Sequence, residues 1–197
     1  PKTIAPAYAS MEFSMMDAAV TEMARYYGLP AESSPGGSDT HILDIQNSYE
    51  SGAMAIPTLL SWPDIVVGPG MLDGSMVSSL EKMLIDVEIF RLGKQSHRGV
   101  TTSEENWLTD VIKKVGPGGN YLCERSTVKA VRSDEWYISD FGSHDTFENW
   151  DMGDKKGLLE EAHEKVNHIL KTHPLLPLGD DVEKELARIC RRAKEAS

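Results

Sequence analysis

The sequence has few cysteines and no long apolar run. Its two cysteines, Cys123 and Cys190, are too few for the disulfide framework of a small secreted domain and show no metal-ligand spacing. We therefore expect two buried thiols, a reducing cytoplasm and no metal site. No apolar run approaches the roughly 20 residues of a membrane-spanning helix, and no secretory signal pattern stands at the start. These absences favour a cytoplasmic protein without a membrane partner.

Positive charge is also scarce. Lysine and arginine together number 20 against 31 aspartates and glutamates, which gives a formal net charge of −11. A nucleic-acid surface needs clustered basic residues, so this balance argues against a nucleic-acid partner. It is compatible with a cationic small molecule or a basic protein partner.

The remaining composition is that of a soluble globular protein. The 197 residues are 40% hydrophobic and 26% charged, which suits one domain or slightly more and a sizeable core. The chain starts with Pro1 and not with methionine, so we expect it to be a piece of a longer protein.

Hydrophobic periodicity predicts an alternation of helices and short strands. Apolar residues recur at spacings of three and four on single helix faces, and Tyr49 is expected in the core. The expected helices are residues 11–27, 42–60, 75–92, 103–115, 154–172 and 181–195, with strands at residues 31–34 and 64–67. Pro57 should kink or shorten the second helix. The alternation predicts an α/β fold with parallel strands.

Two Gly-rich loops follow the two expected strands, at residues 35–41 and 68–75. Loops after parallel strands gather at the strands' carboxyl ends, where ligands bind in α/β folds. We therefore expect these loops to open into the same cavity.

Four stretches in order resemble the trimethylamine methyltransferase family. They are MARYYGLP at residues 23–30; GSDT at 37–40 with LDIQ at 43–46 and Tyr49-Glu50; GMLDGS at 70–75 with LEK at 80–82 and IDVEI at 85–89; and VGPGG at 115–119 with Ser126-Thr127, Trp136 and ENW at 148–150. Their order and spacing match the C-terminal region of that family along nearly the whole chain.

The resemblance implies the C-terminal part of a (β/α)8 TIM-type barrel with additional C-terminal helices. Residues 1–100 would supply the last barrel units, and residues 101–197 a mostly helical extension packed on the barrel. It also implies a methyltransferase that moves a methyl group from a methylated amine to the cobalt of a corrinoid protein. The cobalamin would be carried by that partner protein and not bound tightly by this chain.

The donor would be a quaternary amine such as glycine betaine, or trimethylamine. Some family members contain pyrrolysine, whereas every residue here is standard, which fits the branch that resembles enzymes for quaternary amines. Many relatives also carry histidines near the turns of the third and fourth motifs, where this chain has Val67, Asn120 and Ser126. These replacements motivate the alternative of a non-catalytic module on the same fold that docks a corrinoid protein.

The candidate site residues lie in and just after the two loops. A quaternary ammonium cannot donate a hydrogen bond and is held by aromatic faces and nearby carboxylates. We therefore take the loop carboxylates Asp39 and Asp73 as catalytic. The expected substrate-binding residues are Ser38, Thr40, His41, Gln46, Gly68, Gly70 and Gly74.

Simpler roles remain open for several of these residues. Asp39 would otherwise cap the following helix, and Asp73 would be an ordinary turn residue. Asp44 and Glu50 would be solvated helix charges. A third reading is an unrelated barrel enzyme that uses Asp39 and Asp73 as paired carboxylates, as a glycoside hydrolase would.

A piece of a parallel barrel leaves strand edges unpaired, and unpaired edges invite association. We therefore expect the chain alone to form a homo-oligomer or to cover its edges with its C-terminal helices. We also expect it to be inactive alone, because barrel active sites collect residues from many strands.

Overall fold

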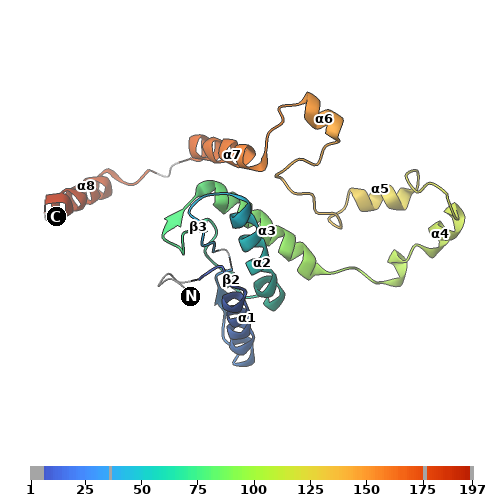
Figure 1. The fold of residues 1–197 in the computed structure, drawn as a ribbon, viewed down its shortest axis with the longest axis horizontal. Coiled ribbons are helices and arrows are strands. Elements are labelled where there is room, and N and C mark those ends of the chain that lie inside the picture. The colour runs from blue at the N-terminus through green and yellow to red at the C-terminus, as the bar shows by residue number, and fades with distance from the viewer. Residues whose placement is uncertain (1–6, 36, 175–176, 196–197) are drawn as a thin grey trace. The chain divides into compact units, whose positions relative to one another are not determined.

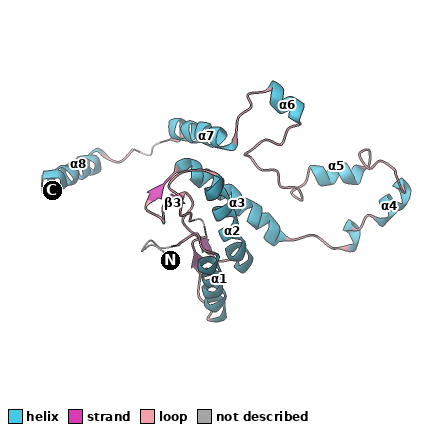
Figure 2. Cartoon of the chain, in the orientation of Figure 1, coloured by secondary structure: helices cyan, strands magenta, loops and turns pink. Residues whose placement is uncertain are grey.

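The computed structural model describes residues 7–35, 37–174 and 177–195, which are mostly helical with a few short strands (Figures 1 and 2). The elements in chain order are α1 (Met11–Tyr26), β1 (Glu32–Ser33), α2 (Ile45–Ser61), β2 (Ile65–Val66), β3 (Met71–Leu72), β4 (Val77–Ser78), α3 (Leu80–Arg98), η1 (Glu104–Asn106), α4 (Thr109–Val115), α5 (Arg125–Val131), α6 (Phe147–Met152), α7 (Leu158–Thr172) and α8 (Asp180–Glu195). The chain has two compact units, one ending at Val166 and one beginning at Asn167.

The strands β1 and β2 pair in parallel, with Glu32 opposite Ile65 and Ser33 opposite Val66. Helix α2 connects them, which gives the β–α–β arrangement predicted from the hydrophobic pattern. The pairing is confirmed, although each strand is two residues long where four were expected. The sheet contains no third strand among the described residues, so the (β/α)8 barrel remains an expectation.

The strands β3 and β4 form a short antiparallel hairpin that the sequence did not predict. Met71 lies opposite Ser78, and Leu72 opposite Val77. The hairpin occupies residues where the third helix was expected to begin. That helix starts instead at Leu80, where the Ser79 side chain accepts a hydrogen bond from the backbone N–H of Lys82 and caps the first turn.

Helices α1, α2 and α3 pack in sequence, α1 against α2 and α2 against α3. Polar residues outnumber apolar ones among the buried described residues. Helix α1, for example, buries Ser14 and Thr21, and the Ser14 hydroxyl donates to the carbonyl of Met54 at 2.6 Å. The buried core of this chain is therefore largely a hydrogen-bonded one.

The apolar helix faces that the periodicity identified lie mostly at the surface. Met16, Val20 and Tyr27 of the first helical segment are each more than 60% exposed, and Tyr49 of α2 is 62% exposed. The expectation of Tyr49 in the core is therefore wrong for this chain. The predicted helical period was correct, but the period alone does not show whether another element packs against the apolar face of the helix.

Several other boundaries differ from the sequence prediction. Pro57 lies inside α2 without ending it. The helix expected at residues 103–115 is divided into η1 and α4, because Leu108 adopts a left-handed conformation with φ of 52°. Cys123 and Cys190 are both exposed, which corrects the expectation of buried thiols. None of the helices among the described residues has both the length and the apolar character needed to cross a membrane.

Candidate functional site

The first Gly-rich loop, residues 35–41, is held by the carboxylate of Glu50 on helix α2. Gly36 lies outside the described residues. The Ser38 hydroxyl donates to Glu50 Oε2 at 2.7 Å, and the backbone N–H of Asp39 donates to the same oxygen at 3.1 Å. Gln46 Nε2 donates to the other oxygen, Oε1, at 2.7 Å. Glu50 is buried, so its interpretation as a solvated helix charge is wrong.

The side chain of Asp39 contacts the backbone of the segment that precedes helix α1. The backbone N–H of Tyr8 donates to Asp39 Oδ1 at 3.1 Å. The Tyr8 ring meets the Phe13 ring edge to face, with centroids 5.4 Å apart. Asp39 is not the cap of the following helix, because the Asp44 side chain accepts from Asn47 N–H in that role. Sequence analysis missed Tyr8 as a neighbour, since 31 residues separate it from Asp39.

In the second Gly-rich loop, residues 68–75, two glycines occupy positions where a larger side chain would clash with neighbouring atoms. Gly68 and Gly70 both have φ of 90°. A Cβ at Gly68 would lie 2.7 Å from the hydroxyl of Ser34 at the end of β1, and one at Gly70 would lie 2.8 Å from the carbonyl of Ser79. Because glycine has no side chain, this loop can lie directly against Ser34 and Ser79.

The turn of the second loop is in the left-handed conformation over three successive residues, Asp73, Gly74 and Ser75, with φ of 50°, 56° and 72°. Non-glycine residues in this region cost free energy and persist where the surroundings fix them, often at functional sites. Ser75 precedes the hairpin strand β4.

The two loops are hydrogen-bonded directly to each other. The backbone N–H of Asp73 donates to the carbonyl of Thr40 at 2.9 Å, and that of Gly74 donates to the carbonyl of Ser38 at 3.3 Å. These two bonds flank Asp39. In addition, His41 Nδ1 lies 2.9 Å from Asp73 Oδ1. The contacts bring the acidic residues of the two loops to one place, at the carboxyl ends of the paired parallel strands.

The structure thus places the sequence-predicted residues as follows. The loop contacts bring together Ser38, Asp39, Thr40, His41, Asp73 and Gly74; Gln46 joins through Glu50; Gly68 and Gly70 lie between β2 and β3 and fix the loop backbone. The roles of these residues in binding or catalysis stay predictions. The side chain of His41 is 78% exposed and that of Asp73 is 40% exposed in this chain.

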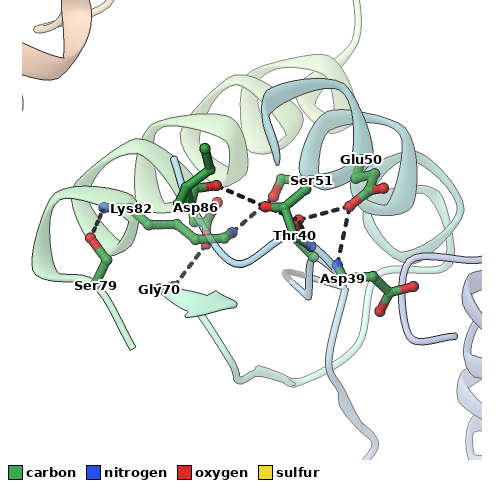
Figure 3. Close-up of polar contacts among 10 residues, drawn as sticks. Asp39, Thr40, Glu50, Ser51, Gly70, Ser79, Lys82 and Asp86 are labelled. Atoms are coloured by element: carbon green, nitrogen blue, oxygen red, sulfur yellow. Dashed lines mark hydrogen bonds and ion pairs between the residues drawn. The ribbon is translucent and has the colours of Figure 1, made fainter. Parts of the chain in front are cut away.

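Beneath the loops lies a buried ion pair on helix α3 (Figure 3). Lys82 Nζ donates to Asp86 Oδ2 at 2.6 Å and to the hydroxyl of Ser51 on α2 at 2.8 Å. The same Asp86 oxygen accepts from the backbone N–H of Gly70 at 2.7 Å. Burial lowers the pKa of the Lys82 amine and raises the pKa of the Asp86 carboxyl, because each charged form loses hydration. Their mutual attraction opposes both shifts.

The arrangement provides two carboxylates and one imidazole at the loop surface, with buried charges behind them. No three histidine, cysteine, aspartate or glutamate side chains within residues 7–35, 37–174 and 177–195 are grouped in a way that could hold a metal ion. Carboxylates at a surface attract a cationic organic ligand.

Comparison with known proteins gives a family match over nearly the whole chain. The sequence model of the family described as Trimethylamine methyltransferase (MTTB) matches residues 2–197. The trimethylamine methyltransferase MttB of Methanosarcina barkeri (strain Fusaro / DSM 804) is 32% identical over 193 residues, which is 95% of this chain and 37% of the relative.

Two bacterial relatives are similar to a comparable degree. The trimethylamine methyltransferase MttB of Desulfitobacterium hafniense (strain DSM 10664 / DCB-2) is 30% identical over 186 residues, covering 94% of this chain and 37% of the relative. The glycine betaine methyltransferase of Desulfitobacterium hafniense (strain Y51) is 30% identical over 188 residues, covering 94% and 39%. The chain therefore spans less than two fifths of the length of these relatives.

Proposed function

This chain belongs to the trimethylamine methyltransferase family, and on that basis we propose that the full-length protein transfers a methyl group from a methylated amine to the cobalt of a corrinoid protein. The relatives bear the names of methyltransferases for trimethylamine and for glycine betaine. Because the chain covers only part of their length, the activity is proposed for the full-length protein, and the chain alone is expected to be inactive.

One observation carries the placement of the site: the two Gly-rich loops are hydrogen-bonded to each other after two parallel strands. In α/β folds, ligands bind outside the carboxyl ends of such strands. We place the methylated amine at this edge, beside Asp39 and Asp73. The remaining strands of a (β/α)8 barrel would complete the cavity from the part of the protein beyond this chain.

The charge at this edge supports a cationic donor. A carboxylate about 4 Å from an ammonium contributes roughly 4 kcal/mol of Coulomb attraction at the effective dielectric of a protein surface. Tyr8, whose backbone N–H donates to Asp39, packs its ring edge to face against Phe13, and an aromatic face turned toward the methylated nitrogen would add about 0.5–2 kcal/mol. Asp39 and Asp73 would therefore bind and orient the donor, with its methyl group turned toward solvent.

The reaction breaks the bond between the methyl carbon and nitrogen, and the electron pair of that bond leaves with nitrogen. A reduced corrinoid carried by the partner protein would supply the nucleophile for the methyl group. A quaternary amine departs as a neutral tertiary amine and needs no proton. Trimethylamine must first carry a proton on nitrogen, and the carboxylate of Asp73, which lies beside His41, would accept a hydrogen bond from that N–H.

The exposure of the loops fits a cobalamin that a partner protein presents. His41 and Asp73 are substantially accessible in this chain, and the proposal requires that the rest of the full-length protein leaves them accessible to the corrinoid protein. Positioning is the main task for the protein in such a reaction, and the hydrogen bonds that the loop backbones donate to Glu50 and Asp86 serve that task.

A direct test combines the full-length protein, a reduced corrinoid protein and a panel of amines that includes glycine betaine and trimethylamine. We expect one amine to lose a single methyl group, measured by proton NMR of the demethylated product, with the 197-residue chain alone as an inactive control. The analogue 3,3-dimethylbutanoate, in which an uncharged carbon replaces the positively charged nitrogen of glycine betaine while the carboxylate is kept, should fail to compete. Absence of transfer from every amine would contradict the proposal.

The non-catalytic alternative makes a different prediction for the same protein. It expects the corrinoid protein to bind, measured by isothermal titration calorimetry, while no amine binds and no methyl group is transferred. It is motivated by the family resemblance, which implies histidine near Val67 and at the positions of Asn120 and Ser126.

A further inference from the structure

The two Gly-rich loops are each anchored by a buried carboxylate from a different helix. Glu50 of α2 accepts the backbone N–H of Asp39 in the first loop. Asp86 of α3 accepts the backbone N–H of Gly70 in the second loop. In both cases the bond reaches the loop backbone itself, so a shift of either carboxylate would move the loop that it holds.

A single buried ammonium group lies between these two anchors. Lys82 is fully buried; its Nζ donates to Asp86 and to Ser51, the residue that follows Glu50 on α2. The charge of Glu50 also raises the pKa of Lys82, although burial, the larger influence, lowers it. The ammonium is therefore within electrostatic range of both carboxylates. Figure 3 shows Lys82 and Asp86 on one side of this cluster, Ser51 and Thr40 at its centre, and Glu50 and Asp39 on the other side.

We propose that Lys82 is a positioning residue that fixes the two loops relative to each other, and with them Asp39 and Asp73; this inference rests on the proposed function of those loops. The amine bonds to one anchor, Asp86, and to the helix turn that carries the other, Glu50. Loss of the ammonium leaves two buried carboxylates without their shared counter-charge, which favours protonation or outward movement of one of them.

A purely structural role would look different in the assay. A buried ion pair that only stabilises the fold changes the fraction of active protein, which lowers the apparent kcat and leaves KM unchanged. A residue that positions the substrate loops changes KM and the binding of the amine in the folded protein as well.

The test uses the full-length protein with the substitution Lys82→Met, which keeps the length of the side chain and removes its charge. We expect KM for the amine to rise about tenfold or more, as small displacements of substrate-positioning groups do. We also expect faster amide hydrogen exchange in both loops, at residues 37–41 and 68–75. The matched control is Glu88→Gln, because Glu88 is a buried carboxylate on the same helix that contacts Tyr137 and Arg91.

Unchanged KM and unchanged exchange in both loops of a folded Lys82→Met protein would overturn the proposal. Where Lys82→Met does not fold, Ser51→Ala removes only one hydrogen bond of the amine, and the same two measurements are made on it with the same expected directions. A wild-type protein that transfers no methyl group would refute the proposed function instead. In that case, the rates of amide hydrogen exchange in the two loops still decide whether Lys82 fixes the loops relative to each other.

Discussion

At the scale of single residues, the second Gly-rich loop depends on the absence of a side chain at Gly70. Its φ is 90°, and an added Cβ would lie 2.8 Å from the Ser79 carbonyl and 3.1 Å from Met83 Cβ. We predict that Gly70→Ala destabilises the protein by about 2–4 kcal/mol, from left-handed strain and overpacking together. The free energy of unfolding in urea measures this.

The control for this change is Gly52→Ala in helix α2. An added Cβ there meets no atom within 4 Å, and alanine is favoured over glycine in a helix by about 0.5–1 kcal/mol. Gly52→Ala should therefore increase the free energy of unfolding. Equal effects of the two substitutions would contradict the close approach of the loop to α3.

Glu81 gives a prediction about pH. A hydrogen bond from His163 lowers the pKa of the Glu81 carboxyl below its ordinary value of 4.5, and Ser79 acts in the same direction. The stability from this contact is therefore fully present above the unfolded pKa and is lost as pH falls through the lower folded pKa. The free energy of unfolding of Glu81→Gln should be lower than that of wild type above pH 4.5, and the gap should close on acidification. A gap that is constant down to pH 2 would contradict this.

The candidate residues illustrate what a sequence can show at this scale. The loop residues Asp39 and Asp73 could be selected because glycines and strand patterns mark the turns in which they lie. Glu50 and Lys82 could not be recognised as buried, because charged residues on helices are usually solvated. Only the tertiary contacts with Ser38, Asp39, Ser51 and Asp86 reveal their burial.

At the scale of elements, the helices and the parallel strands were predictable, but their packing was not. The pattern of residues 64–67 predicted a strand, and β2 lies there paired with β1. The hairpin of β3 and β4 was missed because its strands are two residues each, too short to show an alternating pattern. The hydrophobic period located the apolar face of each helix. The sequence of a helix does not show which other part of the protein packs against that face.

The exposed apolar faces of α1 and α2 give an element-scale prediction. Val20 and Tyr49 are both about 60% exposed, and apolar surface of this kind promotes association. The 197-residue chain should therefore self-associate in solution, and the double substitution Val20→Glu and Tyr49→Glu should shift it toward the monomer. Light scattering measures both. A wild-type chain that is monomeric at all accessible concentrations would contradict the prediction.

At the scale of the whole molecule, the chain represents less than two fifths of the relatives that it matches. It contributes one parallel strand pair and two joined loops to a site that we propose is completed by the rest of the protein. The family could be predicted from the order of four motifs. These motifs lie largely in turns and loops, where the backbone geometry restricts which residues can be present. The barrel could not be tested in this chain, because its closure depends on strands outside it.

The measurement that tests the central claim most directly is kcat/KM for methyl transfer by the full-length protein after Asp39→Asn and Asp73→Asn. Each substitution keeps the shape of the side chain and removes the charge that would attract the ammonium. We predict that each lowers kcat/KM by about tenfold or more, whereas Asp145→Asn at an exposed position leaves it unchanged. Wild-type values of kcat/KM in both loop variants would show that the joined loops are not the donor site.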